Sequence, residues 1–217
     1  MKKRTIVLLA LAHAAFWCAV PPIATWSSLQ PDGDGGGDIL SMIAWIFCVY
    51  IFIFCAFVFV FAFPFSFKSI AAQKICILML LTICLLPVSF WISGSISWSV
   101  QLAEFEKFVV RSQPLITAIK SFSRDEKQPP ISLEQLVPKY IDRIPKVGLS
   151  KRTKFDFWRS KDGKNIRSGG NSWTLCVDLP TGFLDLHYLC YYPNGKYQKP
   201  PSGFFERVKG WAFIVHF

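Results

Sequence analysis

Charged side chains are scarce in the first hundred residues of this 217-residue chain. That segment holds five basic and three acidic residues, Lys2, Lys3, Arg4, Lys68, Lys74, Asp32, Asp34 and Asp38, whereas the rest holds nineteen basic and eleven acidic ones. Because 52% of all residues are apolar and 16% aromatic, an ordinary soluble domain is excluded. The chain divides into a membrane segment, 1–100, and a charged segment, 101–217, large enough to fold as one small domain.

Charge is absent from three apolar runs, at 5–24, 39–63 and 75–98. Each has about the 20 residues that a helix needs to cross a bilayer. Alternate positions of the second run are phenylalanine, Phe57, Phe59, Phe61, Phe63, Phe65 and Phe67. A period of two favours a strand, but a lone strand in lipid leaves its backbone groups unpaired, at several kcal/mol each. We therefore predict three transmembrane helices, with Trp91 and Trp98 in an interface belt.

The first run has two readings. "MKKRTIVLLALAHA" resembles a secretory signal, with Ala12 and Ala14 marking a cleavage site. The apolar run continues past that site to Ile23, which favours an uncleaved helix.

Lys and Arg are absent from the first link, "SSLQPDGDGGGD", while the second carries Lys68 and Lys74. By the positive-inside rule, the N-terminus and the second link are cytoplasmic. Residues 100–217 are then extracytoplasmic, and cleavage of the first run would give the same result.

Cysteine is rare in the charged segment, which contains only Cys176 and Cys190. One pair in an extracytoplasmic domain is a candidate disulfide, with two buried free thiols as the alternative. Two thiols without a neighbouring histidine make a poor zinc site, so we predict no metal and no cofactor.

Histidine is equally rare, at positions 13, 187 and 216. The chain has no H-x-x-H pair, no serine elbow and no paired carboxylates, so we predict no catalytic residues and place an enzyme last among the functions.

Beyond Ser99 the third run continues as an amphipathic helix, which we expect to kink or restart at Pro114, with Ser112 or Gln113 as cap. One face carries Leu102, Phe105, Val109, Ile116, Ile119 and Phe122. This apolar face requires a partner that covers it.

The next segment, "PPISLEQLVPKYIDRIP", is punctuated by prolines. Ser132 and Gln135 predict a capping box that opens a short helix. The expected buried side chains are Leu133, Leu136, Val137, Tyr140, Ile141 and Ile144.

Strand-like alternation follows at 154–160, 172–179, 184–192 and 210–217. Asn194-Gly195 predicts a hairpin turn, and 210–217 is expected to close the sheet as an edge strand. The predicted class is α+β, with an antiparallel sheet of three to five strands packed on the extended third helix.

This order of elements resembles the globular region of type IV pilin-like proteins, closest to the major pseudopilins of type II secretion. The matching positions are Pro130, Leu133, Leu136, Val137, Pro138, Tyr140, Ile141, Ile144 and Pro145. Unlike a pilin, the chain has two earlier spans and no leader-peptidase site before the third, and Asp178 and Asp185 do not form a calcium loop. The resemblance implies a pilin-like domain held permanently in a bacterial inner membrane.

A basic surface is predicted between the pilin-like motif and the later strands. Its members are Lys151, Arg152, Lys154, Arg159, Lys161, Lys164 and Arg167. These residues are candidates for contact with anionic lipid headgroups, the alternative being a solvated loop and a strand edge protected by charge. Nucleic acid is not an expected partner.

Together these features predict a non-enzymatic inner-membrane protein with a periplasmic pilin-like domain. That domain would bind a protein partner or support an envelope or secretion assembly. The alternative is a membrane-anchored sensor or carrier that recognises a small ligand, although no small-molecule substrate can be identified from the sequence.

Overall fold

The computed structural model describes residues 3–33, 37–150, 153–160, 170–179, 186–197 and 203–216. The chain forms two compact units. The helical unit comprises Met1–Ser27 and Gly37–Val100, and the sheet unit comprises Ser28–Gly36 and Gln101–Phe217.

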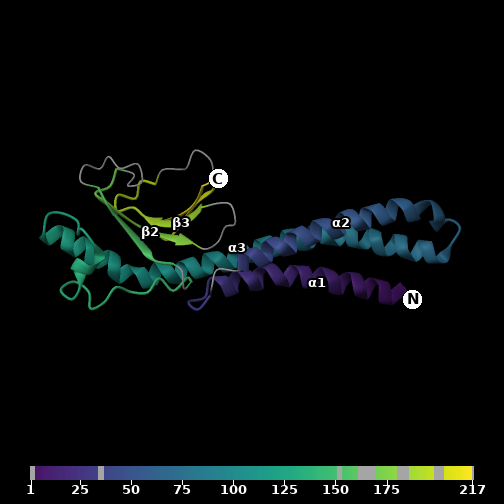
Figure 1. Ribbon diagram of the computed structural model, residues 1–217, viewed down its shortest axis with the longest axis horizontal. Helices are drawn as coiled ribbons and strands as arrows, with labels where there is room; N and C mark the ends of the chain where they lie inside the picture. The colour runs from purple at the N-terminus through teal and green to yellow at the C-terminus, as the bar shows by residue number, and fades with distance from the viewer. Residues whose placement is uncertain are drawn as a thin grey trace. The chain divides into compact units, whose positions relative to one another are not determined.

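Three long helices contain the predicted spans: α1 (Lys3–Ser28), α2 (Gly37–Ser66) and α3 (Ile70–Asp125) (Figure 1). All three are long and apolar enough to cross a membrane. Helix α2 includes the alternating phenylalanines up to Phe65, so the helical interpretation of the run 39–63 is confirmed. Phe57 and Phe61 are each 60% exposed, as expected of side chains that meet lipid rather than protein.

Small residues bring α1 close to α3 within the helical unit. Ser89 and Ser93 of α3 are buried, and the Cys18 thiol of α1 donates a hydrogen bond to the Ser89 carbonyl oxygen at 3.5 Å. Small side chains at such a contact let two backbones approach, which is the usual way that helices associate in lipid.

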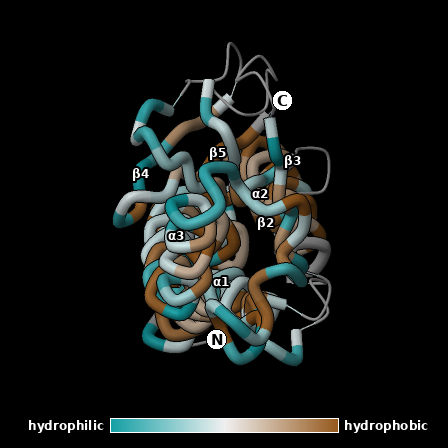
Figure 2. The backbone as a smooth tube through the Cα atoms, turned by 90° about the vertical axis from the view of Figure 1, so that its left-hand side faces the viewer, coloured by the Kyte–Doolittle hydropathy of each residue, from teal (hydrophilic) through white to brown (hydrophobic). Residues whose placement is uncertain are grey.

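Helix α3 continues without a break past the membrane span to Asp125. The predicted restart at Pro114 is therefore wrong. Pro114 is exposed, while Phe108, Leu115 and Ile119 on the opposite side are fully buried. Burial of this face on both sides of the proline offsets the one backbone hydrogen bond that proline removes. Hydrophilic and hydrophobic segments alternate along α3 (Figure 2).

Five antiparallel strands form one sheet, which confirms the α+β class. The strands are β1 (Phe155–Arg159), β2 (Trp173–Leu179), β3 (Leu186–Tyr191), β4 (Phe205–Val208) and β5 (Trp211–His216). Their order is β1-β2-β3-β5-β4. The expected edge position of 210–217 is wrong, because β5 is an inner strand, and β4 was not foreseen.

The hairpin turn lies at Lys209-Gly210 and not at Asn194-Gly195. Val208 pairs with Trp211, leaving two residues between the strands, and both have positive φ, 44° and 87°. That is the requirement of a two-residue type I′ turn. The amide N–H of Asn194 instead donates to the Asn171 side chain at 2.9 Å, so Asn194-Gly195 turns the chain after β3 without pairing β3 to β4.

Helix α3 packs on one face of the sheet through aromatic side chains. The ring centroids of Phe105 and Phe213 are 5.3 Å apart, and those of Phe108 and Trp211 are 4.9 Å apart. Phe108 also contacts Phe155 of β1, at 5.9 Å. The predicted amphipathic face thus finds its partner in β1 and β5. Leu102 and Phe122, at the ends of that face, are only half-buried.

The proline-punctuated connection forms a single 3₁₀ turn, η1 (Leu133–Leu136). Gln135 Oε1 accepts a hydrogen bond from the Ile131 amide at 2.7 Å, but the Ser132 side chain makes no capping bond. The Ser132 hydroxyl instead bonds to Glu134 and lowers the pKa of that carboxyl group. The predicted capping box is therefore wrong, because Gln135 accepts from the Ile131 amide rather than from that of Ser132, and Ser132 is used by a neighbouring acid.

Burial along this connection follows the prediction only in part. Leu133 and Leu136 are buried as expected, whereas Val137 is 37% exposed. Tyr140, Ile141 and Ile144 are half-buried, and the Tyr140 ring lies 5.4 Å from that of Phe122 on α3. The connection therefore fastens the end of α3 through two leucines and one tyrosine.

Gly210→Ala is expected to destabilise the sheet unit by about 1 kcal/mol, because alanine is strained at positive φ. A Cβ at Gly210 would meet no atom within 4 Å, so the loss isolates backbone conformation. Denaturant unfolding in detergent micelles measures it. The matched control is Gly94→Ala in α3, where φ is not positive and a Cβ also meets nothing. A loss of equal size in both variants would contradict the turn assignment.

Candidate functional site

Cys176 and Cys190 form a disulfide across the centre of the sheet. They lie directly opposite each other on the paired strands β2 and β3. Successive side chains of a strand point to opposite faces. Because Leu175 and Val177 lie on the face of Trp211 and Phe213, the disulfide lies on the face away from α3.

An aromatic cluster surrounds the disulfide, and we call the two together the disulfide face. Its buried members are Cys176, Cys190, Ala212 and Ile214, and the half-buried side chains packed against them are Tyr188, Tyr192, Tyr197 and Phe205. The rings of Tyr192 and Tyr197 meet edge-to-face at 5.0 Å. Such a surface combines apolar area with hydroxyl groups, the composition favoured where proteins bind one another.

Tyr197 anchors the cluster to the β4–β5 turn. Its hydroxyl donates a hydrogen bond to the Gly210 carbonyl oxygen. The guanidinium carbon of the exposed Arg207 lies 5.3 Å from the centre of the Tyr197 ring, within the range of a cation–π contact. The disulfide face is therefore built from side chains of the four strands β2, β3, β4 and β5 and of the segment after β3, and Tyr197 ties it to the backbone of the β4–β5 turn.

We expect the free energy of unfolding of the sheet unit at alkaline pH to depend on Tyr192 and Tyr197. Burial raises the pKa of both hydroxyls above the ordinary 10.0. In the unfolded chain they ionise near pH 10, so the unfolded state releases protons first as pH rises. The stability they contribute is complete below pH 10 and is lost as pH rises through the folded pKa.

This dependence can be measured as the denaturant midpoint between about pH 9 and about pH 11. Replacing both tyrosines by phenylalanine is expected to flatten the decline. Tyr50→Phe, at a 68% exposed position of α2, is the control. An identical alkaline slope in the double variant and the parent chain would refute the assignment.

The predicted basic surface is described only at two positions. Lys154 is exposed just before β1. Arg159, at the end of β1, donates through a guanidinium N–H to Gln128 Oε1 at 2.9 Å. Lys151, Arg152, Lys161, Lys164 and Arg167 lie outside the described residues, so contact with anionic headgroups stays a prediction.

The histidines lie in separate places. His13 of α1 accepts a hydrogen bond from the Trp17 indole N–H at 3.1 Å, and His187 of β3 meets the Phe213 ring at 5.6 Å. His216 belongs to β5. Among the described residues, no three His, Cys, Asp or Glu side chains are grouped so that they would hold a metal ion.

The link between α1 and α2 belongs to the sheet unit, although it lies far from the strands in sequence. Leu29 is fully buried, and the buried Ser150 donates its hydroxyl hydrogen to the Gly33 carbonyl oxygen at 3.0 Å. The α1–α2 link and the sheet therefore pack in one compact body. Two segments of one compact body lie on the same side of any membrane that the helices cross.

Comparison with protein families, curated proteins and solved structures finds no match to this chain. The described residues form three helices long and apolar enough to cross a membrane, and an α+β unit whose sheet carries a disulfide.

Sequence reasoning identified the cysteine pair but missed the tyrosines around it. The signal was present in β3, where Tyr188, Cys190 and Tyr192 alternate with Leu189 and Tyr191. A period of two assigns the first three to one face. Tyr197 and Phe205 carried no such signal, because only tertiary folding brings them to the cysteines.

Proposed function

We propose that this chain is a non-enzymatic protein of a bacterial inner membrane whose periplasmic, pilin-like sheet unit binds a protein partner in an envelope or secretion assembly. The observation that carries the proposal is the continuity of α3, which is apolar enough to cross a membrane at its start and lines the sheet at its end. A helix of this kind links the sheet unit directly to a membrane anchor.

Two further observations support the periplasmic side. Disulfides persist in oxidising compartments and are rare in the cytosol, and the Cys176–Cys190 bond lies in the sheet core. The link that packs with the sheet contains Asp32 and Asp34 and no basic residue, which favours the non-cytoplasmic side.

The binding surface is proposed to include the disulfide face and its rim. Arg207 is exposed beside the tyrosine cluster. Phe204, just before the edge strand β4, is 43% exposed at the edge of the sheet, and its ring lies 6.2 Å from that of Phe213 on the other face. Arginine and aromatic side chains are enriched among the residues that dominate protein–protein binding energy.

In-vivo photocrosslinking tests this proposal. A photoreactive amino acid at Arg207 or Phe204 is expected to give one discrete adduct containing an envelope or secretion protein. The same amino acid at Leu8 of α1, which is 65% exposed within a span, serves as the matched control. Adducts from Leu8 alone, or none from either rim position, would count against the proposal.

A further inference from the structure

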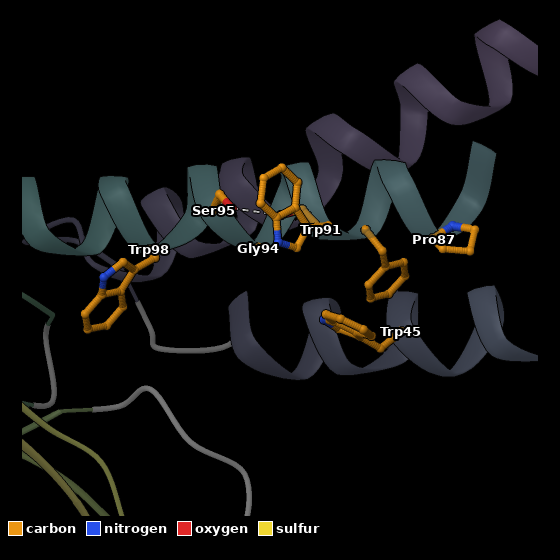
Figure 3. A pocket seen from close by; sticks show the side chains of 7 residues that line it. Trp45, Pro87, Trp91, Gly94, Ser95 and Trp98 are labelled. Atoms are coloured by element: carbon orange, nitrogen blue, oxygen red, sulfur yellow. Dashed lines mark hydrogen bonds between the residues drawn. The ribbon is translucent and has the colours of Figure 1, made fainter. Parts of the chain in front are cut away.

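A groove lies between α2 and α3 within the helical unit. Trp45 of α2 forms one wall, and the α3 residues Pro87, Phe90, Trp91, Gly94, Ser95 and Trp98 form the rest. The groove has a volume of about 720 Å³ and is open along one side. Figure 3 shows Trp45 on one helix across from Trp91, Gly94 and Pro87 on the other.

The groove lies at one end of the membrane span. Trp91 and Trp98 come 21 and 28 residues after Ile70, which places them about 32 Å and about 42 Å along a helix that rises 1.5 Å per residue. The hydrocarbon layer is about 30 Å thick. Trp45 is six residues into the apolar run that begins at Ile39. Counting from either helix, the groove crosses the boundary between hydrocarbon and headgroups, where tryptophan is enriched.

The lining is suited to a hydrocarbon chain rather than a polar molecule. Six of the seven lining residues are tryptophan, phenylalanine, proline or glycine, and the seventh is Ser95. The Ser95 hydroxyl donates to the Trp91 carbonyl oxygen at 3.0 Å, so the helix itself satisfies this polar group. A polar ligand would lose its hydration here without an equivalent hydrogen bond from Ser95.

A second helix is a poorer occupant than a flexible chain. Helices that dock on a glycine in lipid need small neighbours, so that the backbones approach. Here Gly94 is flanked by Trp91, which is 76% exposed, and by Trp98. These indoles hold another helix away from Gly94 but leave room for a thin chain between them.

We infer that this groove binds one acyl chain of a bilayer phospholipid, with the headgroup level with Trp98. The side opening faces the membrane around the helical unit, from which a chain can enter laterally. Gly94 keeps the floor of the groove low, because a Cβ placed there would meet no atom within 4 Å.

Gly94→Leu tests the inference without disturbing the fold. The new side chain enters open space, and leucine is a better helix former than glycine. It fills space that the bound chain occupies, so phospholipid binding is expected to be lost through steric exclusion and lost packing rather than through transfer to water. Ala71→Leu is the matched control, since Ala71 is an exposed position of α3 outside the groove.

Native mass spectrometry of the full chain, extracted with phosphatidylethanolamine, gives the readout. The parent chain and Ala71→Leu are expected to retain one phospholipid per chain, and Gly94→Leu to lose it. In vesicles, phospholipid brominated near the headgroup end of its acyl chain should quench parent tryptophan fluorescence more than lipid brominated near the methyl end. The difference should shrink in Gly94→Leu.

Two results would overturn the inference. One is equal lipid retention by Gly94→Leu and the parent chain. The other is a lipid-free dimer of the parent chain that Gly94→Leu abolishes, which would assign the groove to a second copy.

Discussion

Replacing both Cys176 and Cys190 by alanine is expected to lower the free energy of unfolding of the sheet unit by about 3 kcal/mol, the value for closing a loop of about 15 residues. The two cysteines are 14 residues apart in sequence, and the bond between them limits the freedom of the unfolded chain. They are also buried beneath the tyrosine cluster, so the double variant loses packing as well. Denaturant unfolding in detergent micelles measures the loss, with protease resistance of the sheet unit as the signal.

Cys84→Ala is the control for this prediction. Cys84 is an exposed free thiol of α3 within the helical unit, so its replacement is expected to leave the sheet unit unchanged. If the double variant unfolded at the same denaturant concentration as the parent chain, the disulfide would have no stabilising role.

Trp211→Ala is expected to destabilise the sheet unit by about 3–5 kcal/mol, the range for removing a large buried aromatic side chain. Trp211 is fully buried at the start of β5. Its ring contacts Phe108 of α3 at 4.9 Å and Tyr191 of β3 at 5.7 Å. Its loss leaves a cavity where the helix, the central strand and the β4–β5 hairpin meet, and the same unfolding measurement detects it.

Trp211→Phe distinguishes the packing of the aromatic ring from the effect of the indole N–H. Trp211 Nε1 is buried and has no hydrogen-bond partner, so phenylalanine removes an unsatisfied donor along with part of the ring volume. The loss is therefore expected to be well below that of Trp211→Ala. Equal losses in both variants would contradict the packing role of the Trp211 ring, because phenylalanine keeps most of that ring.

The membrane helices were predictable because the physical constraint on them is local. A run without charge that is long enough to cross lipid must satisfy its own backbone, whatever its side-chain period. The phenylalanines from Phe57 to Phe65 are therefore helical despite their alternation. The positive-inside pattern gave an orientation, which remains a proposal because the helices alone do not define it.

The strand pairing was less predictable because it depends on residues far apart in sequence. Asn194-Gly195 has the composition of a hairpin turn, but β3 pairs with β5, and β4 lies at the edge. The true turn, Lys209-Gly210, has the required glycine but a lysine at its first position. Lys209 also contacts Glu106 of α3 at 2.7 Å, a tertiary interaction that no local pattern shows.

The disulfide face and the groove beside Gly94 also differ in how far the sequence could predict them. The cysteine pair could be inferred because the charged segment contains only two cysteines. The groove beside Gly94 could not, because Trp45 comes from another helix. Trp91 and Trp98 were expected at the membrane interface, but no local pattern shows that they line a groove between α2 and α3.

The proposed function depends above all on a periplasmic location of the sheet unit. A dual reporter fused after Phe217, combining alkaline phosphatase with a fluorescent protein that matures only in the cytoplasm, tests it directly in a bacterial host. A periplasmic sheet unit predicts phosphatase activity without fluorescence. Fluorescence without phosphatase activity would place the sheet unit in the cytoplasm and contradict the proposed orientation.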